Sequence, residues 1–129
     1  MATPDELEQQ HTLSTATTRY DELRMRDALA AMTVDDPPLS REETLELLAL
    51  SEVVIRKAGY GRQAMVRSAR GSGASWNQIG AALGTSKQAA WEAHNRWIED
   101  QARQHELTGF TGLDPSEASA AHGLAGPPD

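Results

Sequence analysis

The sequence contains no cysteine, so disulfide bonds and thiolate metal sites are excluded. Aromatic residues make up only 5% of its 129 residues, with a single phenylalanine, which excludes a large aromatic core. No apolar run approaches the roughly 20 residues that a membrane-spanning helix needs. The first ten residues, MATPDELEQQ, also lack the basic and apolar regions of a secretory signal. We therefore expect a cytoplasmic protein with one modest domain, tails, and a small core of aliphatic residues and tryptophan.

The net charge of −7 conceals a strong segregation of charge along the chain. From Val53 to Arg96 there are seven cations and a single acid, Glu92, so this window carries +6. The rest of the chain carries −13. An acidic protein is on average repelled by nucleic acid. A basic centre between acidic ends nevertheless indicates a candidate surface for a polyanion.

Helix periodicity and helix-breaking residues divide the chain into four zones, which predict an all-α fold. Residues 1–33 are expected to form an acidic helical arm, with a helix from about Pro4 to Met32. Its apolar stripe is narrow, so the helix either packs on another surface, such as a second copy, or frays. Residues 34–39 (VDDPPL) form a linker, because two consecutive prolines cannot lie inside a helix. Residues 40–107 are expected to form a small helical bundle. Residues 108–129, rich in Gly and Pro, are expected to be a disordered tail.

Three Ser/Thr-x-x-Glu/Gln patterns predict where the helices of the bundle begin. The pattern at Ser40 begins a helix that extends to about residue 58. Its apolar residues cover more of the helix surface than a single stripe, which indicates the central, buried helix. A second helix is expected from about residue 60 to 70. The patterns at Ser75 and Thr85 open a short helix to Leu83 and a longer one to about Leu107.

The last two of these helices have the features of two helices joined by a tight turn. Ile79 and Leu83 lie four residues apart and are expected to face a shared core. Gly80 is expected where the second helix crosses closely, and Gly84 to supply the left-handed turn. Ala90 and Ala93 then face inward from the second helix, which leaves its leading residues outward.

The segment SWNQIGAALGTSKQAAWEAHNRW resembles the helix-turn-helix of bacterial transcription regulators, especially small actinobacterial ones, and of the DNA-binding region of sigma factors. The resemblance covers about residues 70–97. It implies double-stranded DNA binding with the second helix in the major groove. The expected base contacts are Ser86, Lys87, Gln88, Trp91 and Asn95. The expected backbone contacts are Arg62, Arg67, Arg70, Ser75, Asn77 and Arg96.

The resemblance further implies a nucleoid-associated transcription regulator that acts as a homodimer on a palindromic site, because a single small module buries little surface. The dimer interface would be the N-terminal helix or the end of the last helix. Two departures stand out. A large indole at Trp91 is unusual on a reading face, and packing against the preceding helix is the alternative for it. Glu92 places an acid close to the phosphates.

Three other interpretations remain open. The αα-hairpin, with Ala and Gly at its crossing, also occurs in purely structural bundles. The chain could instead be a protein-interaction module that binds a sigma factor, a polymerase or another partner, although such a module has no need of the +6 centre. Finally, the acidic ends could lie over the basic face, in which case deletion of Thr108 to Asp129 would tighten DNA binding at low salt.

No catalytic motif, metal site or cofactor site is indicated, so we expect no enzyme. The sequence has no GxSxG, HExxH or phosphate-binding loop. His94 and His105 are eleven residues apart on one helix, about 16 Å along its axis, too far to share a metal. Trp76, Trp97 and Tyr60 are expected in the core.

Overall fold

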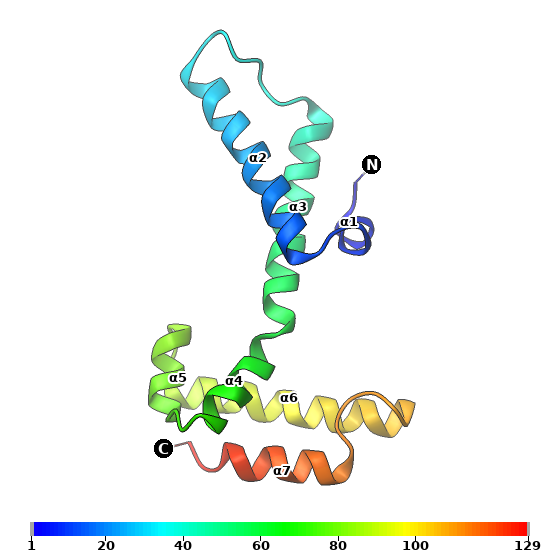
Figure 1. The fold of residues 1–129 in the computed structure, drawn as a ribbon, viewed down its shortest axis with the longest axis vertical. Helices are drawn as coiled ribbons and strands as arrows, with labels where there is room; N and C mark the ends of the chain where they lie inside the picture. Colours follow the sequence, from blue (N-terminus) through cyan, green and yellow to red (C-terminus); the bar gives the residue numbers. More distant parts are fainter. Residues whose placement is uncertain (1, 129) are drawn as a thin grey trace. The chain divides into compact units, whose positions relative to one another are not determined.

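The computed structural model describes residues 2–128, and every regular element in that range is a helix, which confirms the all-α fold (Figure 1). The chain divides into two compact units, Met1–Gly61 and Arg62–Asp129. The boundary therefore falls at Gly61 and not at the proline-containing linker. The helix that follows the linker belongs to the N-terminal unit, because its apolar residues pack on the helices that precede it.

The N-terminal unit consists of α1 (Pro4–Gln10), α2 (Leu13–Met32) and α3 (Arg41–Tyr60). The prediction of one continuous helix from Pro4 to Met32 was wrong, because the chain is extended at His11 and Thr12. Thr12 starts a new helix: its hydroxyl accepts a hydrogen bond from the Thr15 backbone N–H, and the Thr15 hydroxyl accepts one from the Thr12 N–H. These side chains accept the hydrogen bonds of backbone N–H groups that, in a continuous helix, would donate to carbonyls of the preceding turn.

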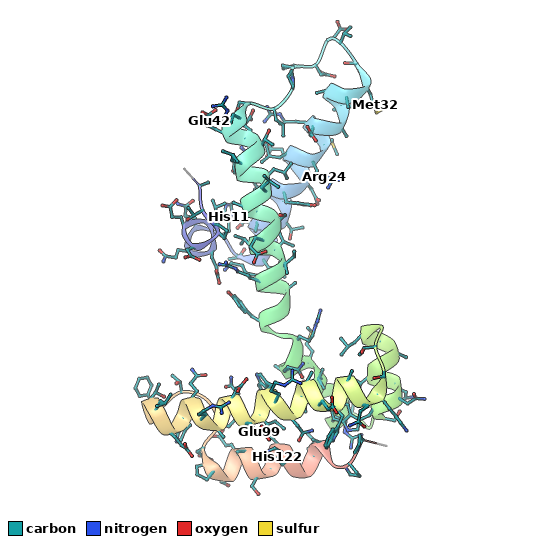
Figure 2. The ribbon with its side chains drawn as sticks, turned by 180° about the vertical axis from the view of Figure 1, so that it is seen from behind. His11, Arg24, Met32, Glu42, Glu99 and His122 are labelled. Carbon is teal, nitrogen blue, oxygen red and sulfur yellow. The ribbon has the colours of Figure 1, made fainter. Side chains whose placement is uncertain are left out.

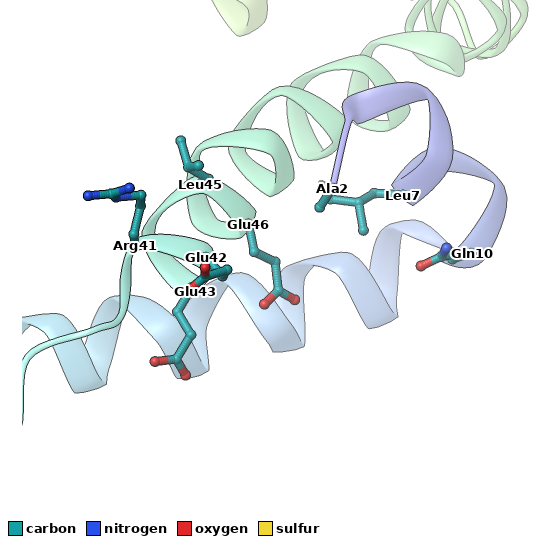
Figure 3. Close-up of a pocket in the computed structure, with 8 residues that line it drawn as sticks. All are labelled: Ala2, Leu7, Gln10, Arg41, Glu42, Glu43, Leu45 and Glu46. Carbon is teal, nitrogen blue, oxygen red and sulfur yellow. The ribbon is translucent and has the colours of Figure 1, made fainter.

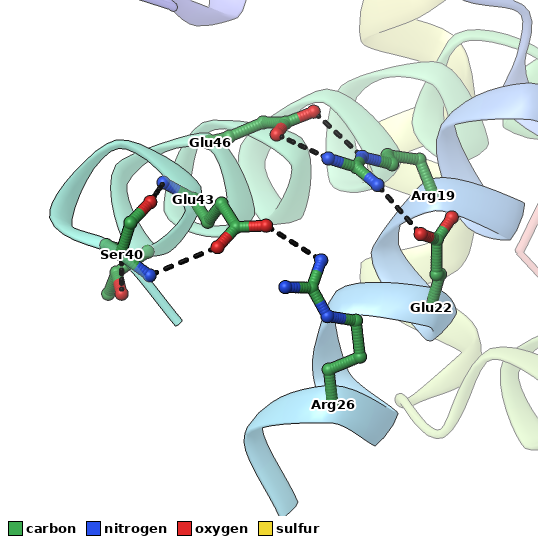
Figure 4. Close-up of polar contacts among 7 residues, drawn as sticks. Arg19, Glu22, Arg26, Ser40, Glu43 and Glu46 are labelled. Carbon is green, nitrogen blue, oxygen red and sulfur yellow. Dashed lines mark hydrogen bonds and ion pairs between the residues drawn. The ribbon is translucent and has the colours of Figure 1, made fainter. Parts of the chain in front are cut away.

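Both α1 and α2 pack on α3, so the N-terminal segment is part of a helical unit rather than a loosely attached arm. Its buried core consists of Leu7, Ala16, Leu23, Ala49, Leu50 and Val53. Ion pairs join the edges of α2 and α3: the Arg19 guanidinium donates to both carboxylate oxygens of Glu46, each at 3.0 Å, and Arg26 pairs with Glu43 at 2.6 Å (Figure 4). Glu43 and Glu46 are therefore paired with arginines of the same unit.

α3 is not the fully buried central helix that its apolar content predicted. Ala49, Leu50 and Val53 are buried, but Leu48 and Ile55 are 63% and 67% exposed. The apolar residues of α3 thus cover two faces, of which one packs on α1 and α2 and the other meets solvent.

The C-terminal unit consists of α4 (Arg62–Gly71), α5 (Trp76–Leu83), α6 (Lys87–Thr108) and α7 (Pro115–Ala125). α6 packs against α4, α5 and α7, and α4 also contacts α5 and α7. Figure 2 shows α7, marked by His122, running alongside α6, marked by Glu99. The buried core consists of Val66, Trp76, Ile79, Ala90, Ile98, Leu113, Ala118, Ala121 and Ala125.

The prediction of a disordered tail over residues 108–129 was wrong, because α7 occupies half of that range and contributes core residues. Asp114 caps this helix by accepting from the Glu117 backbone N–H at 2.8 Å, and Glu117 returns a bond to the Asp114 N–H. Pro115 stands at the first helical position, where proline is favoured because its missing N–H has no partner to lose. Gly109 and Gly126 end their helices, and Gly123 lies at an open position within α7, so none of them breaks a helix.

No helix in residues 2–128 combines the length and the apolar character needed to cross a membrane.

Candidate nucleic-acid interface

The turn between α5 and α6 has the geometry that the glycine pattern predicted. Gly84 adopts the left-handed conformation, with φ of 71°, and ends α5. The Thr85 backbone N–H then donates to the Gly80 carbonyl at 2.8 Å. Ser86, and not Thr85, is the N-cap of α6, with its hydroxyl accepting from the Ala89 N–H at 3.0 Å. The long helix therefore begins one residue later than the Thr85 pattern indicated.

Gly80 lies directly beneath this turn, as expected. A Cβ atom at Gly80 would stand 2.9 Å from the Ser86 carbonyl carbon and the Thr85 oxygen, and 3.0 Å from the Lys87 nitrogen. These are backbone atoms, which cannot rotate away as a side chain can. The start of α6 is thus held against α5 at a distance that only glycine permits.

Gly80→Ala is expected to lower the free energy of unfolding of the C-terminal unit by about 2 kcal/mol, because the added methyl group overlaps backbone atoms. Gly123→Ala is the matched control, since nothing lies within 4 Å of that position in α7. It should stabilise the unit by up to about 1 kcal/mol through the higher helix propensity of alanine. Urea unfolding followed by tryptophan fluorescence distinguishes the two, and equal effects would contradict the close approach at Gly80.

The leading residues of α6 are open to solvent. Ser86, Lys87 and Gln88 are all exposed. The Gln88 side-chain amide donates to the Glu92 carboxylate one turn later, at 2.9 Å. Glu92 therefore orients the Gln88 amide, and the same hydrogen bond stabilises the Glu92 carboxylate.

Trp91 and Asn95 do not point outward, which corrects the expectation that they lie on the reading face. The Trp91 indole is half-buried against the core, and its N–H donates to the Gly126 carbonyl at 2.7 Å. The Asn95 amide donates to the Trp91 carbonyl at 2.9 Å, and its oxygen lies 3.2 Å from His122 Nδ1. The segment at the end of α7 covers this side of α6, which the expected disordered tail would have left open.

The predicted phosphate contacts divide into free and engaged side chains. Arg62, Arg67, Lys87 and Arg96 are exposed, and none forms an ion pair with another residue in the described part of the chain. The Arg67 guanidinium lies 5.7 Å from the centroid of the Trp97 ring. This packing positions the arginine without using its hydrogen-bond donors.

Arg70, by contrast, is engaged in the fold. Its guanidinium donates to the Leu124 carbonyl at 3.2 Å and the Ala74 carbonyl at 3.0 Å, and it lies 5.2 Å from the centroid of the Trp76 ring. Of the two polar residues at the start of α5, Ser75 is the N-cap, with its hydroxyl accepting from the Gln78 N–H, while Asn77 is exposed.

His94 is a central residue of this unit that sequence reasoning weighed only as a metal ligand. It is 1% exposed and lies between the rings of Trp76 and Trp97, with centroid distances of 5.6 and 5.5 Å. Its Nδ1 atom is 2.9 Å from the Gln63 side-chain oxygen of α4. Burial lowers the pKa of His94 to about 4, and the positive charges of Arg67 and Arg70 act in the same direction. The four-residue spacing of Ala90, His94 and Ile98 was the available signal of its inward position.

Among residues 2–128, no three His, Cys, Asp or Glu side chains are grouped so as to hold a metal ion.

A hollow of about 590 Å³ lies in the N-terminal unit, where α1 approaches the start of α3 (Figure 3). Leu7 and Leu45 contribute apolar walls, and Glu43 and Glu46 contribute acids. The Arg19 guanidinium lowers the pKa of Glu46, and the backbone N–H of Ser40 lowers the pKa of Glu43, with Arg26 adding to the effect. Glu46 is bonded to Arg19 of α2, and Glu43 is bonded to Arg26 of α2 and to the Ser40 backbone N–H. The packing of this unit therefore explains the arrangement of both carboxylates.

Compared with protein-family models, curated proteins and solved structures, the chain shows no match.

Proposed function

We propose that the C-terminal unit binds double-stranded DNA through the helix-turn-helix formed by α5 and α6, and that the protein is a bacterial transcription regulator. The observation that carries the proposal is the seating of the Thr85–Lys87 backbone directly on Gly80. This packing fixes the angle at which α6 leaves α5 and leaves its leading residues exposed, as a helix that enters the major groove requires.

Within this proposal, Lys87 and Gln88 read base edges, with Ser86 beside them at the tip of the helix. Lysine bonds to guanine and glutamine bonds to adenine in the major groove. Arg62, Arg67 and Arg96 neutralise phosphates, and Asn77 contacts the DNA backbone next to the N-terminus of α5. Trp91, Asn95 and Arg70 are assigned to the fold and not to DNA, because each is half-buried and donates to a backbone carbonyl.

The protein is proposed to act as a homodimer in the nucleoid. One such module contacts little DNA, and specific operator binding commonly requires two copies on a palindromic site. A dimer also doubles the number of phosphate contacts, which strengthens the salt dependence of binding.

The second candidate function is binding of a transcription component, such as a sigma factor or polymerase. The exposed apolar pair Leu107 and Phe110, at the end of α6, favours it, with 83% and 84% of each residue accessible. Exposed aromatic side chains are common anchors in protein interfaces.

The test is fluorescence anisotropy of the full chain with mixed genomic duplex, titrated with salt. The logarithm of the binding constant should fall steeply with the logarithm of the salt concentration. Lys87→Ala and Arg96→Ala should each weaken binding about 3- to 10-fold, and Arg96→Ala should reduce the salt slope by about 1. Arg41→Ala is the matched control, because Arg41 is also exposed but lies in the N-terminal unit.

A folded chain that does not bind duplex even at low salt would contradict the proposal and favour the transcription-component candidate. Equal weakening by Lys87→Ala and Arg41→Ala would show that binding follows net charge and not the helix-turn-helix.

A further inference from the structure

The N-terminal unit has an open groove between α2 and α3. Its volume is about 410 Å³. The residues that line it are small, apolar or aromatic apart from one cation and one acid: Tyr20, Arg24, Asp27, Ala28, Thr44, Leu47, Leu48 and Ser51. Arg24 marks its position on α2 in Figure 2. Of the lining residues, Tyr20 and Leu47 pack against the buried core of the unit, whereas Leu48 is 63% exposed.

The residues along the α3 side of the groove are spaced as in a helix that packs against another helix. Thr44, Leu48 and Ser51 line the groove, and Ile55 follows them one turn beyond it, at intervals of four, three and four residues. This is the spacing of a coiled-coil seam. Each of the four is uncharged, and the two large ones, Leu48 and Ile55, are both more than 60% exposed. Two large apolar side chains at this spacing, with small hydroxyl residues beside them, form the kind of solvated helix face that another helix covers.

The charges on the α2 side are self-complementary. Arg24 and Asp27 lie three residues apart at the groove, and neither forms an ion pair with any residue in the part of the chain that the structure describes. The Arg24 guanidinium lies over the Tyr20 ring and donates to its phenol oxygen at 3.3 Å. In a twofold-symmetric contact, residue i of one copy meets residue j of the other, and j meets i. An axis between Arg24 and Asp27 would therefore bring each cation opposite the partner copy's acid.

We infer that the α2–α3 groove is the surface through which two copies of this chain associate, as an antiparallel four-helix arrangement of two α2–α3 hairpins. Leu48 and Ile55 of each copy enter the groove of the other, while Arg24 and Asp27 form two equivalent ion pairs at its edge. Thr44, Ser51 and Ala28 are small enough to let the helices approach closely. The inference names the contact surface of the dimer in the proposed function, but its test contains no DNA, so the two can fail separately.

The first test is sedimentation equilibrium of the full chain. The wild type should be a dimer at micromolar concentrations. Leu48→Glu should raise the dimer dissociation constant at least about a hundredfold, because it places an unpaired carboxylate in the contact. Met25→Glu is the matched control: Met25 is 65% exposed on another face of α2, and its substitution should leave the dimer intact. Since both side chains are exposed in one copy, both variants should keep the wild-type helix content.

A monomeric wild type would overturn the inference, as would a dimer that survives Leu48→Glu or is weakened equally by Met25→Glu.

The second test uses the charges. Arg24→Asp alone and Asp27→Arg alone should each weaken the homodimer at least about tenfold, because like charges then face each other. A mixture of these two variants should form a heterodimer, and the double variant Arg24→Asp/Asp27→Arg should recover dimer formation. Failure of both the mixture and the double variant to recover it would overturn the twofold contact.

Discussion

A chain that ends at Gly112 is expected to lose the folded C-terminal unit while keeping the N-terminal one. The truncation removes Leu113 and α7, including three buried alanines, and exposes the core on α4, α5 and α6. It also removes the Ala125 and Gly126 carbonyls that accept the indole N–H groups of Trp76 and Trp91, each loss costing about 1–3 kcal/mol. A unit of this size has a total stability of only about 3–10 kcal/mol.

The measurement exploits the position of the three tryptophans, all of which lie in the C-terminal unit. Their fluorescence should shift to the red and lose its cooperative urea transition, while circular dichroism retains a transition from the N-terminal unit. A chain ending at Pro127 is the control, because it keeps both acceptor carbonyls. A native tryptophan spectrum in the shorter truncation would show that α7 is dispensable.

This expectation replaces the idea that the C-terminal segment is an acidic cover whose removal tightens DNA binding. That idea needs a detachable segment, whereas Ala118, Ala121 and Ala125 are core residues. Loss of DNA binding in the truncated chain would therefore report unfolding, and point substitutions are the appropriate probes of the interface.

The second large effect concerns acidification and His94. The pKa of this imidazole is about 4 in the folded protein and about 6.5 in the unfolded chain. Above pH 6.5 the ring is neutral in both states and contributes nothing to the pH dependence. As the pH falls from 6.5 to 4, the unfolded chain binds a proton that the folded protein does not. The free energy of unfolding should therefore fall by about 3 kcal/mol over this range.

His94→Phe provides the comparison, because it keeps an aromatic ring between Trp76 and Trp97 but cannot titrate. Urea unfolding at several pH values, followed by tryptophan fluorescence, should give a slope between pH 6.5 and 4 that is steeper in the wild type. The carboxylates contribute equally to both proteins, so the difference isolates His94. Parallel curves would contradict the burial of a neutral imidazole.

The sequence was a good guide to local structure. The capping boxes at Ser40 and Ser75, and the roles of Gly80 and Gly84, were predicted correctly because each depends on residues within a turn or two of one another. The break at Thr12 was missed for a related reason. Its capping box uses a threonine, Thr15, in place of Glu or Gln, and so does not match the usual pattern.

Several errors depend on packing between residues that are far apart in the chain. Trp91 and Arg70 looked like outward residues because no local pattern shows that the end of α7, far along the chain, returns to cover them. Tyr60 was expected in the core, but it is exposed and donates its hydroxyl proton to Glu8 of α1. The apolar α3 was expected to be buried on all sides because composition cannot show that one of its faces has no partner within the unit.

The long separation between each indole and its acceptor also has a consequence for biosynthesis. The Trp76 acceptor is made 49 residues after the tryptophan itself. At translation rates of about 5–20 residues per second, roughly 2–10 s pass between the synthesis of Trp76 and that of its acceptor in α7. By then all three helices of the N-terminal unit have been synthesised. During that interval the nascent chain presents a finished acidic unit followed by an apolar, unpaired surface, which is the kind of segment that a chaperone near the ribosome binds.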